Sequence, residues 1–224
     1  MPVFSDPANF DAYVSGFMWI LKMTGASAAL ALVLGVLLAG MRVSPVPVLR
    51  WFGAAWVNIF RNTPLTLIIF FCYFGLYATL TISLSDDLIL NNFWLGVVGL
   101  SVYTAAFVCE ALRSGINTVP PGQAEAARAI GLTFSQTLRI VVLPQAGRAV
   151  IAPLGSVLIA LCKNSTIVGT IGLLEASNIM KQLINDNGDQ VILIFLVFAG
   201  TFAAVLIPVG YFFGWLANRL AVKR

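Results

Sequence analysis

Residues 120–144 read PPGQAEAARAIGLTFSQTLRIVVLP, a polar stretch within an otherwise apolar sequence. Proline is tolerated in the first turn of a helix, where its missing N–H would have no partner, so the two leading prolines predict the start of a short helix. Gly131 predicts its end. Thr133 and Gln136 have the spacing of a capping box, which predicts a second short helix that Pro144 stops.

The two predicted helices present different side chains. The first carries the small residues Ala126 and Ala127, and the second carries Phe134 and Leu138 on one face. Residues 113–148, the polar segment, are too few for a typical independent domain. We therefore expect the polar segment to lean on the rest of the chain and to dock into a groove on another protein.

Composition predicts an integral membrane protein. The chain of 224 residues is 59% hydrophobic and 10% charged, with a mean hydropathy of +0.94, whereas soluble domains are about half apolar. A helix crosses the hydrocarbon with about 20 apolar residues and satisfies its own backbone groups. The fold class expected is an all-α bundle, with residues 1–224 forming a single transmembrane domain.

Apolar runs predict five crossings. They cover residues 13–41, 64–80, 93–112, 149–174 (with a break at 163–166) and 191–216. Asn62 or Thr63 is available to cap the second crossing, with Pro64 at its first helical position. The N-terminal residues 1–12 carry no lysine or arginine, so the start is expected to be retained rather than cleaved as a signal peptide.

Loop charges predict the orientation. Five crossings place the termini on opposite sides of the membrane, and the charged residues divide between these two sides. One side carries Arg42, Arg50, Arg61, Arg113, Arg128, Arg139, Arg148, Arg219, Lys223 and Arg224. The other side carries Asp6, Asp11, Asp86, Asp87, Glu175, Asp186 and Asp189. By the positive-inside rule the N-terminus is outside, and the polar segment and C-terminus are cytoplasmic.

Several classes of function are disfavoured. The chain has no histidine, which removes the commonest general base and metal ligand, and Cys72, Cys109 and Cys162 lie in apolar runs without metal-like spacing. We expect no catalytic residues, no metal site and no bound cofactor. The net charge of +4 follows membrane orientation rather than nucleic-acid binding. No phosphate-binding G-x-x-x-x-G-K-[ST] loop occurs, so any ATP must be hydrolysed by another chain.

The polar segment resembles the signature loop of the membrane subunits of ABC importers. The residues that match are Glu125, Ala126, Ala127, Gly131, Leu143 and Pro144. Residues 61–65 (RNTPL), 71–75 (FCYFG) and 109–116 (CEALRSGI) also resemble the polar amino-acid uptake subfamily, most nearly the permeases of actinobacterial glutamate importers. Asn62 departs from a usual glycine, and Asn164 from a common aspartate.

The resemblance implies a fold, partners and a substrate. It implies a type I importer permease core of five transmembrane helices in a bacterial cell membrane, with residues 113–148 as the cytoplasmic coupling loop. It implies a second permease, favoured as a different chain, two cytoplasmic ATPase subunits and an external solute-binding protein. Glutamate or a related acidic amino acid is the favoured substrate, and the alternatives are glutamine, a basic or a cystine-like amino acid. A channel or structural membrane subunit is the alternative from another class.

A second group of candidate residues is either structural or part of the path. Glu110 and Arg113 are one helical turn apart and are expected to pair, which favours a structural role over substrate contact. Arg61 is expected to anchor the chain at the membrane interface, next to Thr63 and Pro64.

The candidate substrate path is Lys163-Asn164-Ser165-Thr166. This run interrupts an apolar segment about 14 residues, or roughly 21 Å of helix, beyond Arg148. A lysine at membrane depth costs about 2.5–3.5 kcal/mol and usually faces a polar cavity or a partner. We expect the helix to break here and to leave free backbone groups beside the path. The alternative is that Lys163 reaches the outer surface or pairs with a carboxylate of the second permease.

Overall fold

The structure is a computed structural model that describes residues 3–220, and this part of the chain is helical with no strand. In chain order the elements are η1 Val3–Ser5, α1 Pro7–Val43, α2 Pro47–Asn62, α3 Leu65–Phe70, η2 Phe71–Thr79, α4 Leu88–Asn117, α5 Pro121–Ala129, α6 Phe134–Gln136, η3 Thr137–Val142, α7 Leu143–Ala149, α8 Ile151–Asn164, η4 Ser165–Ile171, α9 Ala176–Asp186 and α10 Val191–Leu220. Of the η elements, η2 and η3 are π-helices, whereas η1 and η4 are 3₁₀-helices. The all-α class is confirmed.

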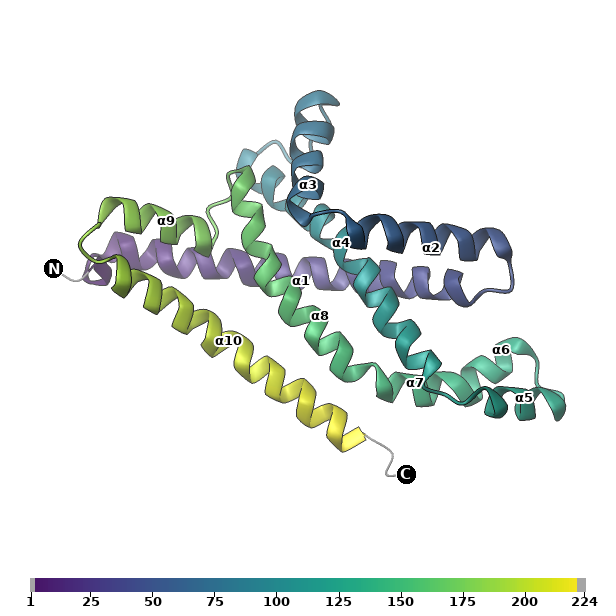
Figure 1. The fold of residues 1–224 in the computed structure, drawn as a ribbon. Helices are drawn as coiled ribbons and strands as arrows, with labels where there is room; N and C mark the ends of the chain where they lie inside the picture. The colour runs from purple at the N-terminus through teal and green to yellow at the C-terminus, as the bar shows by residue number, and fades with distance from the viewer. Residues whose placement is uncertain (1–2, 221–224) are drawn as a thin grey trace.

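Four helices are long and apolar enough to cross a membrane: α1, α4, α8 together with η4, and α10. A fifth crossing exists if α2 and the α3–η2 rod count as one span, although the two parts are bent by 104°. Figure 1 shows α2 running back beside α1, and α3 then turning away from the bundle. The number of crossings is therefore four, or five with the bent pair.

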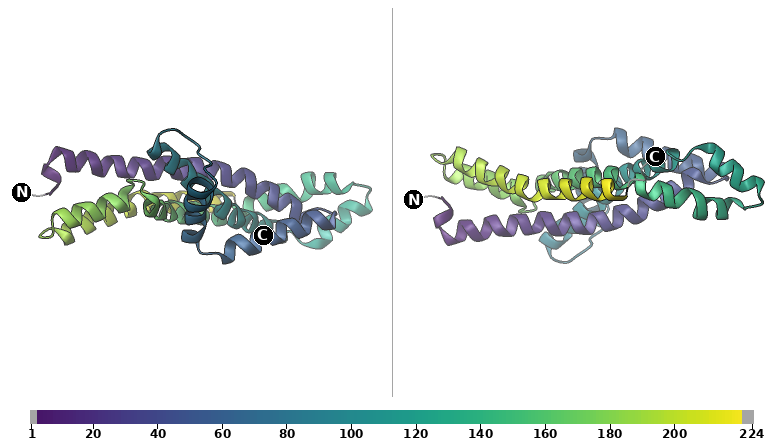
Figure 2. Two further views of the ribbon diagram at one scale, coloured as in Figure 1. Left: turned by 90° about the horizontal axis from the view of Figure 1, so that it is seen from above. Right: turned by 90° about the horizontal axis from the view of Figure 1, so that it is seen from below.

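The molecule is elongated. In the views of Figures 1 and 2, the N-terminus and α9 lie at one end, and α5 and α6 lie at the opposite end. The long helices α1 and α4 pack closely between these ends, and α4 is the most buried of the candidate spans. Gly35 on α1 permits this approach, because a Cβ there would overlap the Val108 side chain of α4.

The helices that contain the first and third predicted crossings extend beyond the predicted apolar runs. α1 begins at Pro7, because Asp6 accepts a hydrogen bond from the Ala8 N–H at 2.9 Å and caps the helix. Likewise α4 begins at Leu88, where Asp87 accepts from the Leu90 N–H at 2.8 Å. Polar residues at both starts look like loop in the sequence, but a carboxylate at the N-cap favours a helix.

The predicted cap of the second crossing is wrong. Asn62 is the last residue of α2 and Thr63 is its C-cap, so neither side chain caps α3. The Thr63 hydroxyl donates backwards to the Ile59 carbonyl at 2.8 Å, and the Asn62 amide donates to the Asn58 carbonyl at 2.7 Å. A proline disfavours the helical backbone conformation at the residue before it, so Pro64 ends α2 and forces the bend. The helix α2 itself was not predicted.

Pro144 does not stop the second helix of the polar segment. The chain continues from α6 through η3 into α7, and Pro144 lies in the first turn of α7. A proline inside an α-helix clashes with the carbonyl four residues earlier and lacks an N–H donor. The wider π turn of η3, directly before the proline, accommodates this residue and the helical course continues.

Candidate functional site

The polar segment forms a helical hairpin at one end of the molecule. Its α5 ends at Ala129, and Gly131, two residues later, has φ +96°, a left-handed conformation that favours glycine. The capping box is confirmed: the Thr133 hydroxyl accepts the Gln136 N–H at 3.3 Å, and the Gln136 side chain accepts the Thr133 N–H at 2.9 Å. These local signals position the turn between α5 and α6.

The six motif residues lie in different environments. Glu125, Ala126, Gly131, Leu143 and Pro144 are exposed, whereas Ala127 is buried. The exposed residues belong to both arms of the hairpin and to its turn. A separate chain could therefore contact most of the motif, while Ala127 packs inside the hairpin.

The hairpin tip presents apolar side chains that the motif does not include. Ile130 is 83% exposed and Phe134 is 48% exposed, on either side of Gly131. The sequence signal for Ile130 is its place directly before the glycine that ends the helix, where no further turn covers it. An exposed apolar tip between capped helices is suited to a groove on another protein.

Two contacts join the hairpin arms and fasten them to the bundle. The side-chain amide of Gln145 donates to the Gln123 side chain at 2.6 Å and to the Val141 carbonyl at 2.9 Å. On α4, a Cβ at Gly115 would overlap the Val150 side chain, so α4 and the α7–α8 junction touch closely. The hairpin is therefore packed against α4 through the junction of α7 and α8.

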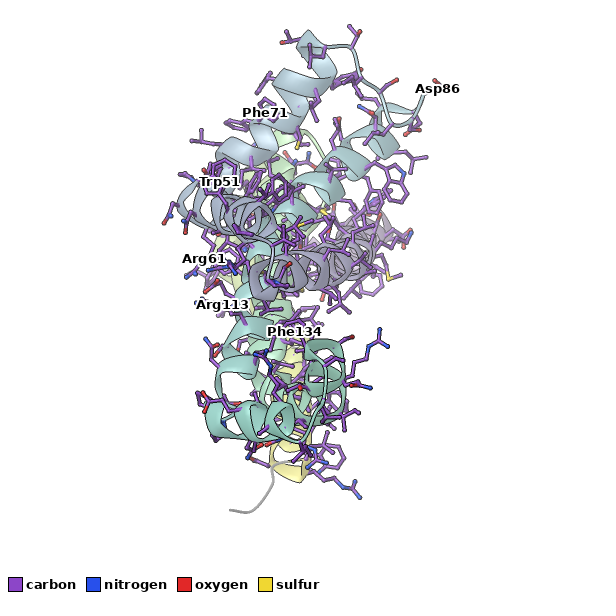
Figure 3. All side chains as sticks on the ribbon, turned by 90° about the vertical axis from the view of Figure 1, so that its right-hand side faces the viewer. Trp51, Arg61, Phe71, Asp86, Arg113 and Phe134 are labelled. Carbon is purple, nitrogen blue, oxygen red and sulfur yellow. The ribbon has the colours of Figure 1, made fainter. Side chains whose placement is uncertain are left out.

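A cluster of ionic side chains links three helices. Glu110 on α4 pairs with Arg42 at the end of α1, with Arg61 at the end of α2 at 3.3 Å, and with Arg113 at 3.7 Å. The predicted Glu110–Arg113 pair is thus present, as one of three. Figure 3 shows Arg61 and Arg113 between Phe71 on the projecting α3–η2 rod and the hairpin.

Sequence reasoning missed Arg42 in this cluster. Its signal was its place in the last turn of α1, but a basic residue there also suits the helix dipole and the membrane surface. Arg61 also lies over the Phe107 ring, 5.7 Å from its centroid, so two interactions orient it. Thr63 and Pro64 form the bend that follows Arg61, between α2 and α3.

A cavity of about 270 Å³ lies between α4 and α8. It is lined by Tyr103, Thr104, Phe107, Ser156, Val157, Ala160, Leu161 and Asn164. Of the four residues predicted for the substrate path, only Asn164 lines this central cavity. The other polar lining residues were missed, although Ser156 precedes Asn164 by eight residues and so shares its helix face.

The predicted helix break at 163–166 is present only as a change of helix type. α8 ends at Asn164 and continues directly into η4, a 3₁₀-helix, so the chain stays helical. The Ser165 hydroxyl donates to the Cys162 carbonyl at 2.7 Å, and the Thr166 hydroxyl donates to the Lys163 carbonyl at 2.8 Å. These two carbonyls therefore accept hydrogen bonds from Ser165 and Thr166, the side chains that were expected to leave backbone groups free. Lys163 is exposed on the outside of α8, and Ser165 is buried.

A buried carboxylate at the other end of α8–η4 was also missed. Glu175 follows η4, lies outside the candidate spans and caps α9. Burial raises the pKa of its carboxyl to about 7, although the Ser177 and Asn178 N–H groups and Lys181 act to lower that pKa. The sequence signal was a single acidic residue between an apolar run and the amphipathic stretch 176–186.

Among the residues that the structure describes, no cluster of histidine, cysteine and acidic side chains could hold a metal ion.

Known proteins resemble the whole chain. Residues 31–222 match the family described as binding-protein-dependent transport system inner membrane component. The glutamate transport system permease protein GluC of Corynebacterium glutamicum is 49% identical, over 92% of this chain and 93% of that protein. The probable glutamine ABC transporter permease protein GlnM of Bacillus subtilis is 38% identical, over 95% and 94%.

Two solved structures share the fold. A chain from the crystal structure of an amino acid ABC transporter with histidines has a TM-score of 0.85 at 24% identity, covering 98% of this chain and 99% of that one. A chain of the MetNI methionine ABC transporter, in an inward-facing conformation, has a TM-score of 0.76 at 21% identity, covering 97% and 100%.

Proposed function

The chain belongs to the family of binding-protein-dependent transport system inner membrane components, and we propose that it is the permease subunit of an ATP-driven importer of glutamate or a related acidic amino acid. The 49% identity to glutamate permeases over nearly the full length supports this substrate. The chain is a multi-pass membrane protein and a transport component, not an enzyme. In this proposal ATP is hydrolysed by a partner chain.

The central cavity is the observation that carries the proposed substrate. Its lining offers the Asn164 amide and the Thr104 hydroxyl, and it contains no acidic side chain. The Ser156 hydroxyl, which also lines it, donates to the Ala152 carbonyl at 3.3 Å. A carboxylate in the cavity would repel a dicarboxylic amino acid, whereas neutral donors can bind its oxygens. Lys163, Asn164, Ser165 and Thr166 line or flank the path in this proposal, with Asn164 as the contact residue.

The hairpin is the proposed joint with the ATPase subunits. Glu125, Ala126, Gly131, Leu143 and Pro144 present the contact surface, and Ala127 sets the hairpin's internal packing. Support comes from the exposed tip at Ile130 and from the close contact of Gly115 with Val150, through which hairpin motion reaches the helices around the cavity. Residues 113–148 act as this coupling loop within one permease domain.

The proposed orientation follows from charge. The hairpin carries Arg128, Arg139 and Arg148, and the opposite end of the molecule carries Asp6, Asp186 and Asp189. The N-terminus is therefore outside, and the hairpin and C-terminus are cytoplasmic. A second permease, a different chain, completes the membrane unit, with two ATPase subunits inside and a solute-binding protein outside.

Uptake by the reconstituted complex tests the substrate. The permease is expressed with its partner permease, ATPase and binding protein, and uptake of labelled glutamate is measured against excess aspartate, glutamine, arginine and cystine. Competition by aspartate but not by arginine is expected. Uptake of arginine or glutamine in preference to glutamate would contradict the proposed substrate, and uptake without ATP would contradict the importer.

A further inference from the structure

Glu175 joins the outer helix α9 to the end of α8–η4. The residue is completely buried and is the N-cap of α9. Its Oε2 accepts a hydrogen bond from the Ser177 N–H at 2.8 Å, and its Oε1 accepts from the Asn178 N–H at 3.0 Å. Both carboxylate oxygens are thus committed to the first turn of α9.

The same carboxylate packs on the backbone of η4. A Cβ added at Gly169 would overlap Glu175 Oε1, so the carboxylate would have to move from its present place. The Asn178 amide donates to the carbonyls of Gly169 at 3.3 Å and Leu173 at 3.2 Å. The first turn of α9 is therefore fastened to η4 by the Asn178 amide, and the Glu175 carboxylate packs against Gly169 beside it.

Helix α1 closes the other side of this junction. A Cβ at Gly16 would lie 3.0 Å from the backbone of Ala176, so α1 and α9 touch backbone to backbone. At its other end η4 begins at Ser165, directly after Asn164 of the central cavity. One continuous helical rod therefore runs from the cavity to Gly169 and the Glu175 carboxylate.

We propose that Glu175 is a positioning residue that transmits displacement of α9, by the external binding protein, along η4 to Asn164. The inference rests on the proposed function. The partner pushes or holds α9 at the outer end, and the carboxylate prevents α9 from sliding on η4.

Few charged groups surround the carboxyl. Lys181 acts on it from α9 itself, η4 carries no titratable side chain, and α10 carries none before Tyr211. On α1 the nearest in sequence to Gly16 are Tyr13, whose hydroxyl forms a hydrogen bond with Thr201, then Asp11, and then Lys22, which lies over the Trp19 ring. Because burial raises the pKa of Glu175, its protonated form is favoured in this joint and its ionised form is favoured in water. The joint is therefore firmer below about pH 7 and looser above it.

The test uses the full complex in lipid vesicles and measures ATPase activity with and without loaded binding protein at about pH 6 and pH 8. In the wild type the stimulation by binding protein should fall as the pH rises. Glu175→Gln imitates the protonated carboxyl and should keep the same stimulation at both pH values. Gly169→Ala displaces the carboxyl group and should lower the stimulation about tenfold at both pH values, the effect of losing about one hydrogen bond.

Asp186→Asn, which removes an exposed carboxylate from the other end of α9, is the matched control and should retain the wild-type pH response. A Glu175→Gln complex with the wild-type pH response would overturn the proposal, as would normal stimulation in Gly169→Ala. The Glu175→Gln comparison decides the matter alone if Gly169→Ala assembles poorly. If even the wild-type complex is not stimulated by binding protein, the proposed function fails instead.

Discussion

The guanidinium group of Arg61, at the end of α2, lies 3.3 Å from the carboxylate of Glu110 on α4, and the same carboxylate pairs with Arg42 and Arg113. One acidic side chain therefore balances three cations from three helices. Glu110 is 27% exposed, and Arg42 is the most buried of its partners at 17%. A partly buried carboxylate that pairs with three arginines holds the ends of helices together.

Replacing Glu110 by Gln should destabilise the protein, because three arginines would face one another without a counter-ion. The expected loss is about 2 kcal/mol, between the values for exposed and buried ion pairs. Arg113→Gln is the matched control and should cost well under about 1 kcal/mol, since its side chain is 41% exposed. Thermal unfolding of the purified subunit measures both, and equal effects would contradict the central role of Glu110.

Replacing Gly131 by Val should uncouple ATP hydrolysis from transport. A β-branched residue at φ +96° costs about 1–2 kcal/mol, so the hairpin turn is distorted while the membrane helices still insert. Glu125→Lys should have a similar effect through the exposed contact surface. Uptake per ATP hydrolysed is the measurement. Gly122→Ala is the control, because a Cβ there meets nothing within 4 Å. Wild-type uptake in both Gly131→Val and Glu125→Lys would refute coupling at the hairpin.

Replacing Asn164 by Asp should raise the KM for glutamate uptake at least about tenfold. A carboxylate would then face the substrate's carboxylates inside the cavity, where charge repulsion is stronger than in water. Uptake assays across substrate concentrations measure this change. The neighbouring Lys163→Met should abolish uptake if Lys163 touches the substrate, whereas Lys163→Arg should retain part of it. An unchanged KM in a well-assembled Asn164→Asp complex would remove Asn164 from the path.

A single cysteine at position 136, in a background lacking Cys72, Cys109 and Cys162, should react with membrane-impermeant maleimide only after the cells are opened. Gln136 lies on the exposed hairpin, so the thiol would be accessible from the side that the hairpin occupies. A cysteine at Asp186 on α9 is the control and should react in intact cells. Labelling of position 136 from outside would reverse the proposed orientation.

Raising the pH from about 5 to about 8 should lower the thermal stability of the isolated subunit through Glu175. The pKa of this carboxyl is raised from 4.5 to about 7 in the folded state, so the folded state binds the extra proton. The stabilisation is complete below about pH 4.5 and is lost as the pH rises through about 7, by up to about 3 kcal/mol. Glu175→Gln should flatten this profile, and an identical slope in the variant would exclude Glu175 as its source.

Local signals in the sequence predicted local structure well. The left-handed glycine at Gly131 and the capping box at Thr133 and Gln136 are both present, because each depends on residues within one turn. Pro144 was misread because it lies in the first turn of α7, where a proline is tolerated, and η3 carries the helical course into that turn. The amphipathic helices α2 and α9 were missed because their polar residues resemble loops when the packing partner is unknown.

The sequence by itself determined the membrane location, the helical class and the hairpin, because hydropathy, helix periodicity and turn chemistry act between neighbours in the chain. Only the tertiary structure decided which polar groups meet. Arg42 and Glu110 are 68 residues apart, and the cavity combines residues of α4 and α8 that no spacing rule connects. Burial of Glu175 likewise depends on how α1, η4 and α9 pack around it, and burial is what changes the chemistry of its carboxyl.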